Sequence, residues 1–104
     1  MATTTEYIEY VCEQINDVGE IRYKKMFGEF MVYVNNKPII IVCNNIPFVK
    51  KLDCIKDIMK NAETGFPYKG AKEHYILDID NREFCKSVII ELEKITPIPK
   101  PKKK

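Results

Sequence analysis

The chain has no tryptophan, a single histidine and no pair of cysteines spaced C-x-x-C. A structural zinc site needs cysteine and histidine ligands at short spacing, and His74 is far from every cysteine along the chain. The same distance argues against a cysteine–histidine catalytic pair. We therefore expect four free thiols, no metal and no cofactor, and the four cysteines are Cys12, Cys43, Cys54 and Cys85.

Long hydrophobic runs are also missing. The longest strongly apolar run is residues 39–43, whereas a membrane-spanning helix needs about 20 apolar residues. The first residues, MATTTEY, contain no apolar segment of the kind that export signals carry. Together with the unpaired cysteines, this predicts a cytoplasmic protein without a membrane partner.

Positive charge is scarce outside the last residues. The net charge of the whole chain is +2, but Lys100, Lys102, Lys103 and Lys104 supply four of the 17 basic groups. Residues 1–96 hold 13 basic and 15 acidic groups, a net charge of −2, so the total gives no sign of a basic face for a polyanion. We expect residues 1–96 to form one domain and residues 97–104 to form a disordered lysine- and proline-rich tail.

Helical periodicity marks the two ends of the folded part. Thr3 and Glu6 have the spacing of a capping box, and an apolar face follows at Ile8, Val11, Cys12 and Ile15. Near the other end, Asp80 and Glu83 have the same spacing. The wide apolar face that follows them predicts a helix that ends at Thr96–Pro97.

Between these helices the pattern changes to short strands. Residues 30–34 alternate, residues 39–43 form a continuous β-branched run, and residues 46–51 are a third strand. Each gap holds an Asn-Asn pair, Asn35–Asn36 or Asn44–Asn45, which suits the tight primed turn of a hairpin. The unbroken run predicts that residues 39–43 form the central strand, buried on both faces.

The second half adds fewer elements. Asp53 has the position of an N-cap for a short helix that reaches Ala62, and residues 75–79 are expected to form a fourth strand. The fold class is therefore α+β, in the order α-β-β-β-α-β-α. A three-strand antiparallel meander and a fourth strand are flanked by N-terminal and C-terminal helices.

The loop between Gly65 and Gly70 has the glycine spacing of a phosphate-binding loop, but it lacks the Lys-Ser/Thr pair and the following helix. Phe66 and Tyr68 fill it instead. Loops run over the surface, and aromatic residues exposed together suit partner binding. The alternative is that both rings fold back as a lid on the sheet.

The stretch KKMFGEF, residues 24–30, resembles the R-K-M-F-G-G motif of the N-terminal domain of the TfoX/Sxy family of competence regulators. Lys25, Met26, Phe27 and Gly28 match that motif directly. The segments PFVKKLD and GFPYKGAKEHYIL are also similar to later segments of the family, so the resemblance spans about residues 5–95.

The resemblance implies an α+β fold similar to that of small type III secretion chaperones, which are often dimers that bind other proteins. It implies a regulatory, non-catalytic domain with a protein partner, and it leaves a homodimer open. In this family, regulators of competence act with other transcription factors. The alternative function is nucleic-acid binding through the basic tail.

Two groups of residues are therefore candidates for partner binding. The first is the motif itself, in which we expect Gly28 to take a positive φ or a bulge and Met26 and Phe27 to anchor the bend. The second is the aromatic pair of the glycine-bracketed loop. The candidates are Lys24, Lys25, Met26, Phe27, Gly28, Phe66 and Tyr68.

Overall fold

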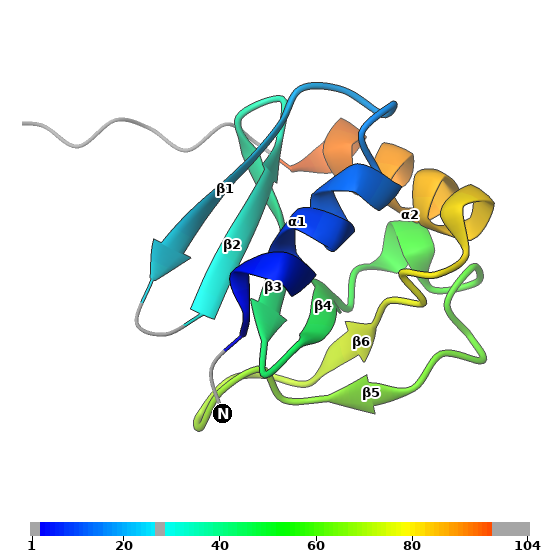
Figure 1. The fold of residues 1–104 in the computed structure, drawn as a ribbon. Helices are drawn as coiled ribbons and strands as arrows, with labels where there is room; N and C mark the ends of the chain where they lie inside the picture. Colours follow the sequence, from blue (N-terminus) through cyan, green and yellow to red (C-terminus); the bar gives the residue numbers. More distant parts are fainter. Residues whose placement is uncertain (1–2, 27–28, 97–104) are drawn as a thin grey trace, which may run out of the picture.

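The computed structural model describes residues 3–26 and 29–96 (Figure 1). Phe27, Gly28 and residues 97–104 lie outside the described residues, as does the side chain of Met26. The expectations for the bend and for the tail therefore concern parts of the chain that the structure does not describe.

Within residues 3–26 and 29–96, six strands form one antiparallel sheet, in the order β1-β2-β3-β4-β6-β5. Two α-helices and one 3-10 turn complete the fold. The elements are α1 (Thr5–Gln14), β1 (Ile21–Met26), β2 (Glu29–Val34), β3 (Lys37–Cys43), β4 (Ile46–Lys50), η1 (Asp53–Ile55), β5 (Thr64–Gly65), β6 (His74–Ile76) and α2 (Arg82–Ile95).

The predicted α+β class, with a helix near each end and an antiparallel sheet between them, is confirmed. The sheet is larger than predicted because β1 and β5 were not recognised in the sequence. β1 pairs with β2 over its whole length, from Ile21 opposite Val34 to Met26 opposite Glu29. Its sequence, IRYKKM, is too charged to show an apolar period of two.

The central hairpins follow the prediction. β3 lies between β2 and β4, and it is joined to each through an Asn-Asn turn. Asn35, Asn36, Asn44 and Asn45 all have positive φ, between 53° and 68°. That conformation defines the primed turns that match the twist of paired strands.

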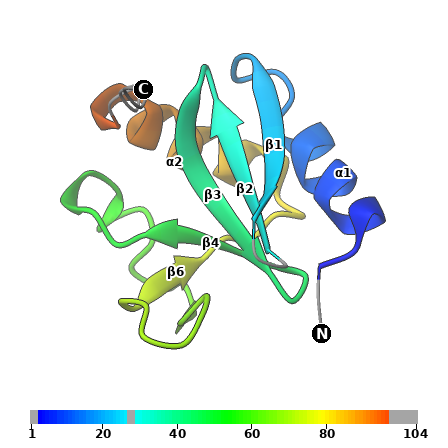
Figure 2. The ribbon, with the colours of Figure 1, turned by 90° about the vertical axis from the view of Figure 1, so that its left-hand side faces the viewer.

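The two faces of the sheet differ, which corrects the expectation that the central strand is buried on both sides. Ile40 and Val42 are fully buried, whereas Ile41 and Cys43 on the opposite face are half-buried. Both helices lie on the same side of the sheet, α1 against β1 and α2 against β3 (Figures 1 and 2). In Figure 2 the other face of the sheet is turned towards the viewer.

The main core fills the space between this sheet and the helices. α1 contributes Ile8, Val11 and Ile15, each with no exposed surface. α2 contributes Cys85, Val88, Ile89 and Leu92 at helical spacing. Burial of aliphatic side chains at about 1.5–3 kcal/mol each is the main force that holds this layer together.

Both predicted helix starts were one or two residues early. α1 is capped by Thr4, whose side chain accepts a hydrogen bond from the Tyr7 amide, and α2 is capped by Asn81, which accepts from Phe84. Thr3 instead donates to the Val42 carbonyl and accepts from the Asn45 amide. It therefore ties the start of α1 to the β3–β4 turn.

The expected short helix between residues 53 and 62 is not an α-helix. Only η1 is regular, and turns follow it to residue 61. Leu52 occupies the cap position and makes no side-chain capping bond, so Asp53 is the first residue of the turn rather than its N-cap. Ile55 and Met59 still enter the core from this segment.

Candidate functional site

The face of the sheet that the helices leave uncovered is the candidate site, and we call it the open face. Successive side chains of a strand point to opposite faces, so the strand register assigns its members. Lys24 lies opposite Met31, Ile41 opposite Phe48, and Lys50 opposite His74. Its strand residues are Arg22, Lys24, Glu29, Met31, Tyr33, Ile41, Cys43, Phe48, Lys50, His74 and Ile76.

Two adjoining grooves cross the open face. The larger has a volume of about 680 Å³ and runs between the end of β4 and the loop that carries Tyr68 and Lys72. The smaller, about 90 Å³, lies over the strands and is lined by Met31, Pro38, Ile39, Ile41, Phe48, Lys50 and His74. Ile41, Lys50 and His74 line both, so the two grooves form one concave surface.

The floor of this surface is closely packed and apolar. Phe48 is 4% exposed although it lies outside the main core cluster, because the open face has its own small packing group. The His74 ring meets the Phe48 ring edge-on, with 6.5 Å between centroids. Gly65 completes the contact, since a Cβ there would come within 3.2 Å of the Phe48 ring.

His74 also fixes the loop. Its Nδ1 lies 2.7 Å from the carbonyl oxygen of Lys72. A carbonyl only accepts, so Nδ1 carries the proton and donates to it. The buried histidine therefore holds the backbone beside Lys72 at the rim of the groove.

The charges at the rim are mostly positive. Lys51 is neutralised by Glu73 at 2.9 Å, and its ammonium lies 5.4 Å from the centre of the Tyr75 ring. Within residues 3–26 and 29–96, Lys50 and Lys72 have no ion-pair partner. Glu29 is the acidic member of the strand residues of the open face.

The structure separates the two lysines of the KKMFGEF motif. Lys24 is opposite Met31 on the open face, whereas Lys25 is opposite Phe30 on the helix-covered face. The two are therefore not one charged patch. Met26 enters the site only through its backbone pairing with Glu29, while Phe27 and Gly28 lie outside the described residues.

The two aromatic candidates are both exposed rather than folded back as a lid. Phe66 is 63% exposed and Tyr68 is 50% exposed. Tyr68 lines the larger groove together with Lys50 and Lys72. Phe66 lies two residues away at the start of the same loop.

Sequence reasoning missed most of the groove, namely Ile41, Phe48, Lys50, Lys72 and His74. The sequence did contain one signal for the Ile41–Phe48 part of the groove. A two-residue turn at Asn44–Asn45 fixes the register of the hairpin, and that register sets Ile41 opposite Phe48. The pairing of β4 with β6, which brings His74 to Lys50, has no comparable local signal.

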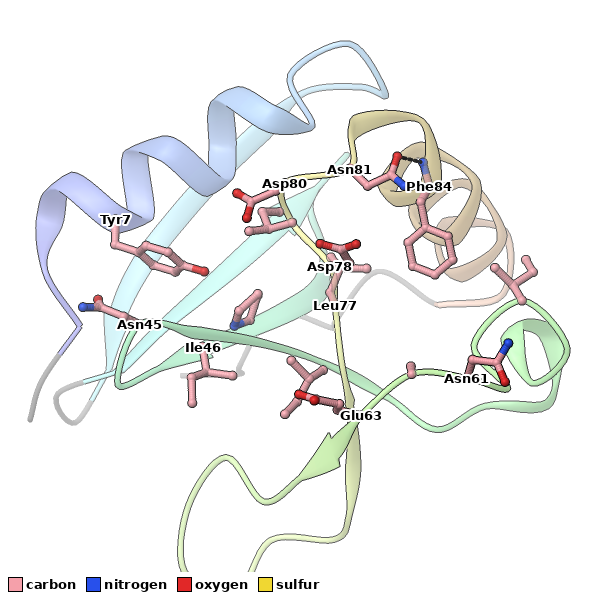
Figure 3. Close-up of a pocket in the computed structure, with 15 residues that line it drawn as sticks. Tyr7, Asn45, Ile46, Asn61, Glu63, Leu77, Asp78, Asp80, Asn81 and Phe84 are labelled. Atoms are coloured by element: carbon pink, nitrogen blue, oxygen red, sulfur yellow. Dashed lines mark hydrogen bonds between the residues drawn. The ribbon is translucent and has the colours of Figure 1, made fainter.

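A second cavity, of about 630 Å³, lies between α1, the start of α2 and the segment after β6 (Figure 3). Its polar rim includes Glu63, Asp78 and Asp80, and its apolar wall includes Leu77 and Phe84. Figure 3 shows the Tyr7 ring reaching into the space below Asp80. Burial and the nearby Asp80 carboxylate raise the pKa of Tyr7 to about 12.

The chemistry of this cavity is that of a negatively charged, partly apolar hollow. Among the residues that the structure describes, no lysine, arginine or histidine lines it. The Tyr10 hydroxyl donates to the Asp80 carboxylate and so occupies part of its accepting capacity. In the part of the chain that the structure describes, no three His, Cys, Asp or Glu side chains are arranged to hold a metal ion.

The fold and the open face define a small α+β domain whose sheet is covered by helices on one side only. No protein-family model matches the chain. It is 30% identical over 105 residues to the uncharacterized 12.7 kDa protein in the trpE 5′ region of Spirochaeta aurantia, an alignment that covers 99% of this chain and 91% of the relative. The chain belongs to the family of that protein. No helix in residues 3–26 or 29–96 is long and apolar enough to cross a membrane.

Proposed function

We propose that this chain is a non-catalytic, protein-binding domain of the TfoX N-terminal type that acts in regulation. The observation that carries the proposal is the open face, a sheet surface with apolar grooves beside a loop with two exposed aromatic rings. Buried aromatic anchors in apolar pockets supply much of the energy of protein–protein contacts. The resemblance of residues 5–95 to the TfoX/Sxy N-terminal domain supports the same role.

The state of three of the four cysteines, Cys12, Cys43 and Cys85, supports a non-catalytic role. A nucleophilic cysteine needs a lowered pKa, because the thiolate is the reactive form. Burial raises the pKa of Cys12 to about 11 and that of Cys85 to about 12. Desolvation and the Glu29 carboxylate also raise the pKa of Cys43, whose sulfur lies 3.7 Å from Glu29 Oε2. These three thiols stay protonated at neutral pH.

The proposal is tested by comparing the proteins captured from the host by three forms of the chain. Phe66→Ser/Tyr68→Ser removes the exposed rings of the loop. Ile90→Ser/Ile95→Ser removes two exposed apolar side chains of α2, which are 44% and 53% exposed, and so serves as the matched control. We expect a partner that binds the wild type and the α2 variant but not the loop variant.

Capture that survives the loop variant and fails with the α2 variant would move the interaction to the helices and contradict the proposal. Both variants change exposed side chains, so each should keep the thermal stability of the wild type. That stability is measured first, so that loss of capture is not loss of the fold.

One observation favours a second candidate, which is binding of an anionic nucleic acid. Lys24, Lys50 and Lys72 lie on the open face or its rim, and further lysines lie between residues 100 and 104. Phosphate binding depends on such charges and weakens steeply with salt.

A further inference from the structure

We infer that the natural occupant of the open face is an extended, acidic segment of a partner protein that places an apolar side chain in the groove. This inference rests on the proposed function, because it names the chemistry of the partner that the open face would bind. It depends on three features of the described residues: where the charges lie, how the groove is shaped and which rings are accessible.

The first feature is a separation of charge that the net charge of the chain conceals. Among the helices, the three glutamates of α2 are balanced by Arg82, Lys86 and Lys94, whereas α1 carries Glu6, Glu9 and Glu13 and no basic residue. The sheet has the opposite sign, since Arg22, Lys24 and Lys50 share the open face with Glu29. Although residues 1–96 have a net charge of −2, the open face is thus basic and α1 is acidic, so an acidic partner is steered to the open face.

The second feature is the shape of the groove. The smaller part has room for about one aliphatic side chain between Met31, Ile41 and Phe48. Lys50 lines both parts, at the place where they join, and Lys72 lines only the larger part. An apolar side chain followed by carboxylates in an extended chain matches this order of pocket, cation and cation.

The third feature argues against nucleic acid as the occupant. Binding of single strands uses aromatic faces on which bases stack. On the strands of the open face, Phe48 is 4% exposed and packs against the His74 ring, and Tyr33 is half-buried, whereas the exposed rings of Phe66 and Tyr68 belong to the loop beside the strands. The strands therefore present apolar edges and ammonium groups, which suit a peptide better than a row of bases.

The test is a titration of the full ¹⁵N-labelled chain with the peptide acetyl-DELDE-amide, followed by NMR. The control peptide is acetyl-NQLNQ-amide, which keeps the shape and the leucine and removes the charge. We expect saturable shifts of the amides of Ile41, Lys50, Lys72 and His74 with the acidic peptide, weaker at high salt. The neutral peptide should bind at least about fivefold more weakly.

Charge reversal provides the matched variants. Lys50→Glu/Lys72→Glu reverses the two groups at the groove, and Lys56→Glu/Lys60→Glu makes the same change in net charge near η1. All four lysines are exposed, so both variants should fold as the wild type does. We expect the first variant to lose at least about tenfold in affinity for the acidic peptide and the second to change less than about twofold.

The inference is overturned if the acidic peptide shifts only helix residues, if both peptides bind equally, or if the two variants lose affinity equally. Tighter binding of an oligothymidylate of about 15 nucleotides at the same residues would assign the face to nucleic acid instead. A captured partner that needs Phe66 and Tyr68 but binds Lys50→Glu/Lys72→Glu normally would leave the proposed function standing and refute the acidic segment. Capture that ignores the aromatic rings would refute the proposed function itself.

Discussion

At the scale of single residues, four asparagines form the two tight turns that join β2, β3 and β4. Asn is tolerated at positive φ because its short polar side chain bonds locally, whereas most side chains meet a steric penalty there. Asn35 and Asn45 have a second use. Asn35 accepts from the Glu20 amide and Asn45 accepts from the Thr4 amide, so each turn is tied to a neighbouring segment.

Asn44 allows a clean test of this account, because it is exposed and no side-chain hydrogen bond is found for it among the described residues. Its φ is 53°. Asn44→Val should lower the free energy of unfolding by about 1–2 kcal/mol, whereas Asn44→Gly should stay within a few tenths. Urea denaturation at neutral pH measures both. Equal losses in the two variants would mean that the side chain, not the backbone conformation, is what matters.

Lys24 and Lys25 have a structural explanation that the sequence alone did not supply. β1 is at the end of the strand order, so one side of it presents unpaired backbone groups. Charged side chains, lysine above all, on such a strand oppose pairing with another molecule. The two lysines therefore disfavour strand pairing between β1 and another molecule. Of the two, Lys24 lies on the open face and Lys25 does not.

At the scale of elements, one ion pair joins the sheet to α2. The Lys37 ammonium lies 3.0 Å from the Glu93 carboxylate and also donates to the Glu93 carbonyl at 2.8 Å. Hydrogen bonds from Lys37 and then from Asn35 lower the pKa of Glu93 below its ordinary value. The last turn of α2 is therefore attached to the β2–β3 hairpin.

This pair predicts a pH dependence of stability. A carboxylate with a lowered folded-state pKa stabilises the fold above its unfolded pKa, about 4.3, and that stability is lost as pH falls through the folded value. Glu93→Gln should therefore lower the urea midpoint at pH 7, and the difference from wild type should shrink as the pH is lowered below about 4.

Glu91→Gln is the control, because the Glu91 carboxylate pairs with Lys94 inside the same helix, and the bond that Glu91 accepts from the Cys54 thiol of η1 uses its backbone carbonyl, which the substitution keeps. We expect it to change the midpoint less than Glu93→Gln does. A difference between wild type and Glu93→Gln that stays constant down to acid pH would show that the carboxylate's charge is not involved.

At the scale of the whole molecule, opposite charges collect on opposite sides. α1 carries three glutamates and no basic residue, and the open face carries Lys24 and Lys50, which have no ion-pair partner among the described residues. Such a distribution attracts an anion to one side and repels it from the other. For a long polyanion such as duplex DNA, the net charge of −2 of residues 1–96 leaves little attraction.

We therefore expect duplex DNA to bind weakly and mostly through the tail. The slope of log K against log salt should be no steeper than about −4, since four lysines are available there. Replacing Lys100, Lys102, Lys103 and Lys104 by glutamine should abolish measurable binding at physiological salt. Fluorescence anisotropy over a salt series measures this, and tight, salt-resistant binding by the glutamine variant would favour the nucleic-acid function.

The sequence by itself determined the features that depend on near neighbours. Helical spacing gave the apolar faces of α1 and α2, and the two Asn pairs gave the hairpins around β3, because turn chemistry and side-chain period act within a few residues. The helix caps were misplaced because several residues near each start, such as Thr3 and Thr4, are chemically able to cap. Only the folded chain decides which of them does.

The tertiary structure alone decided the candidate site. β1 is a strand because it pairs with β2, although its own residues show no strand pattern, and the 53–62 segment stays in turns although its pattern is helical. Lys50, Lys72 and His74 meet through the β4–β6 pairing, and Glu91 and Lys24 lie on opposite sides through the packing of α2. The charge of a face is a sum over residues that are distant in sequence, so no local pattern contains it.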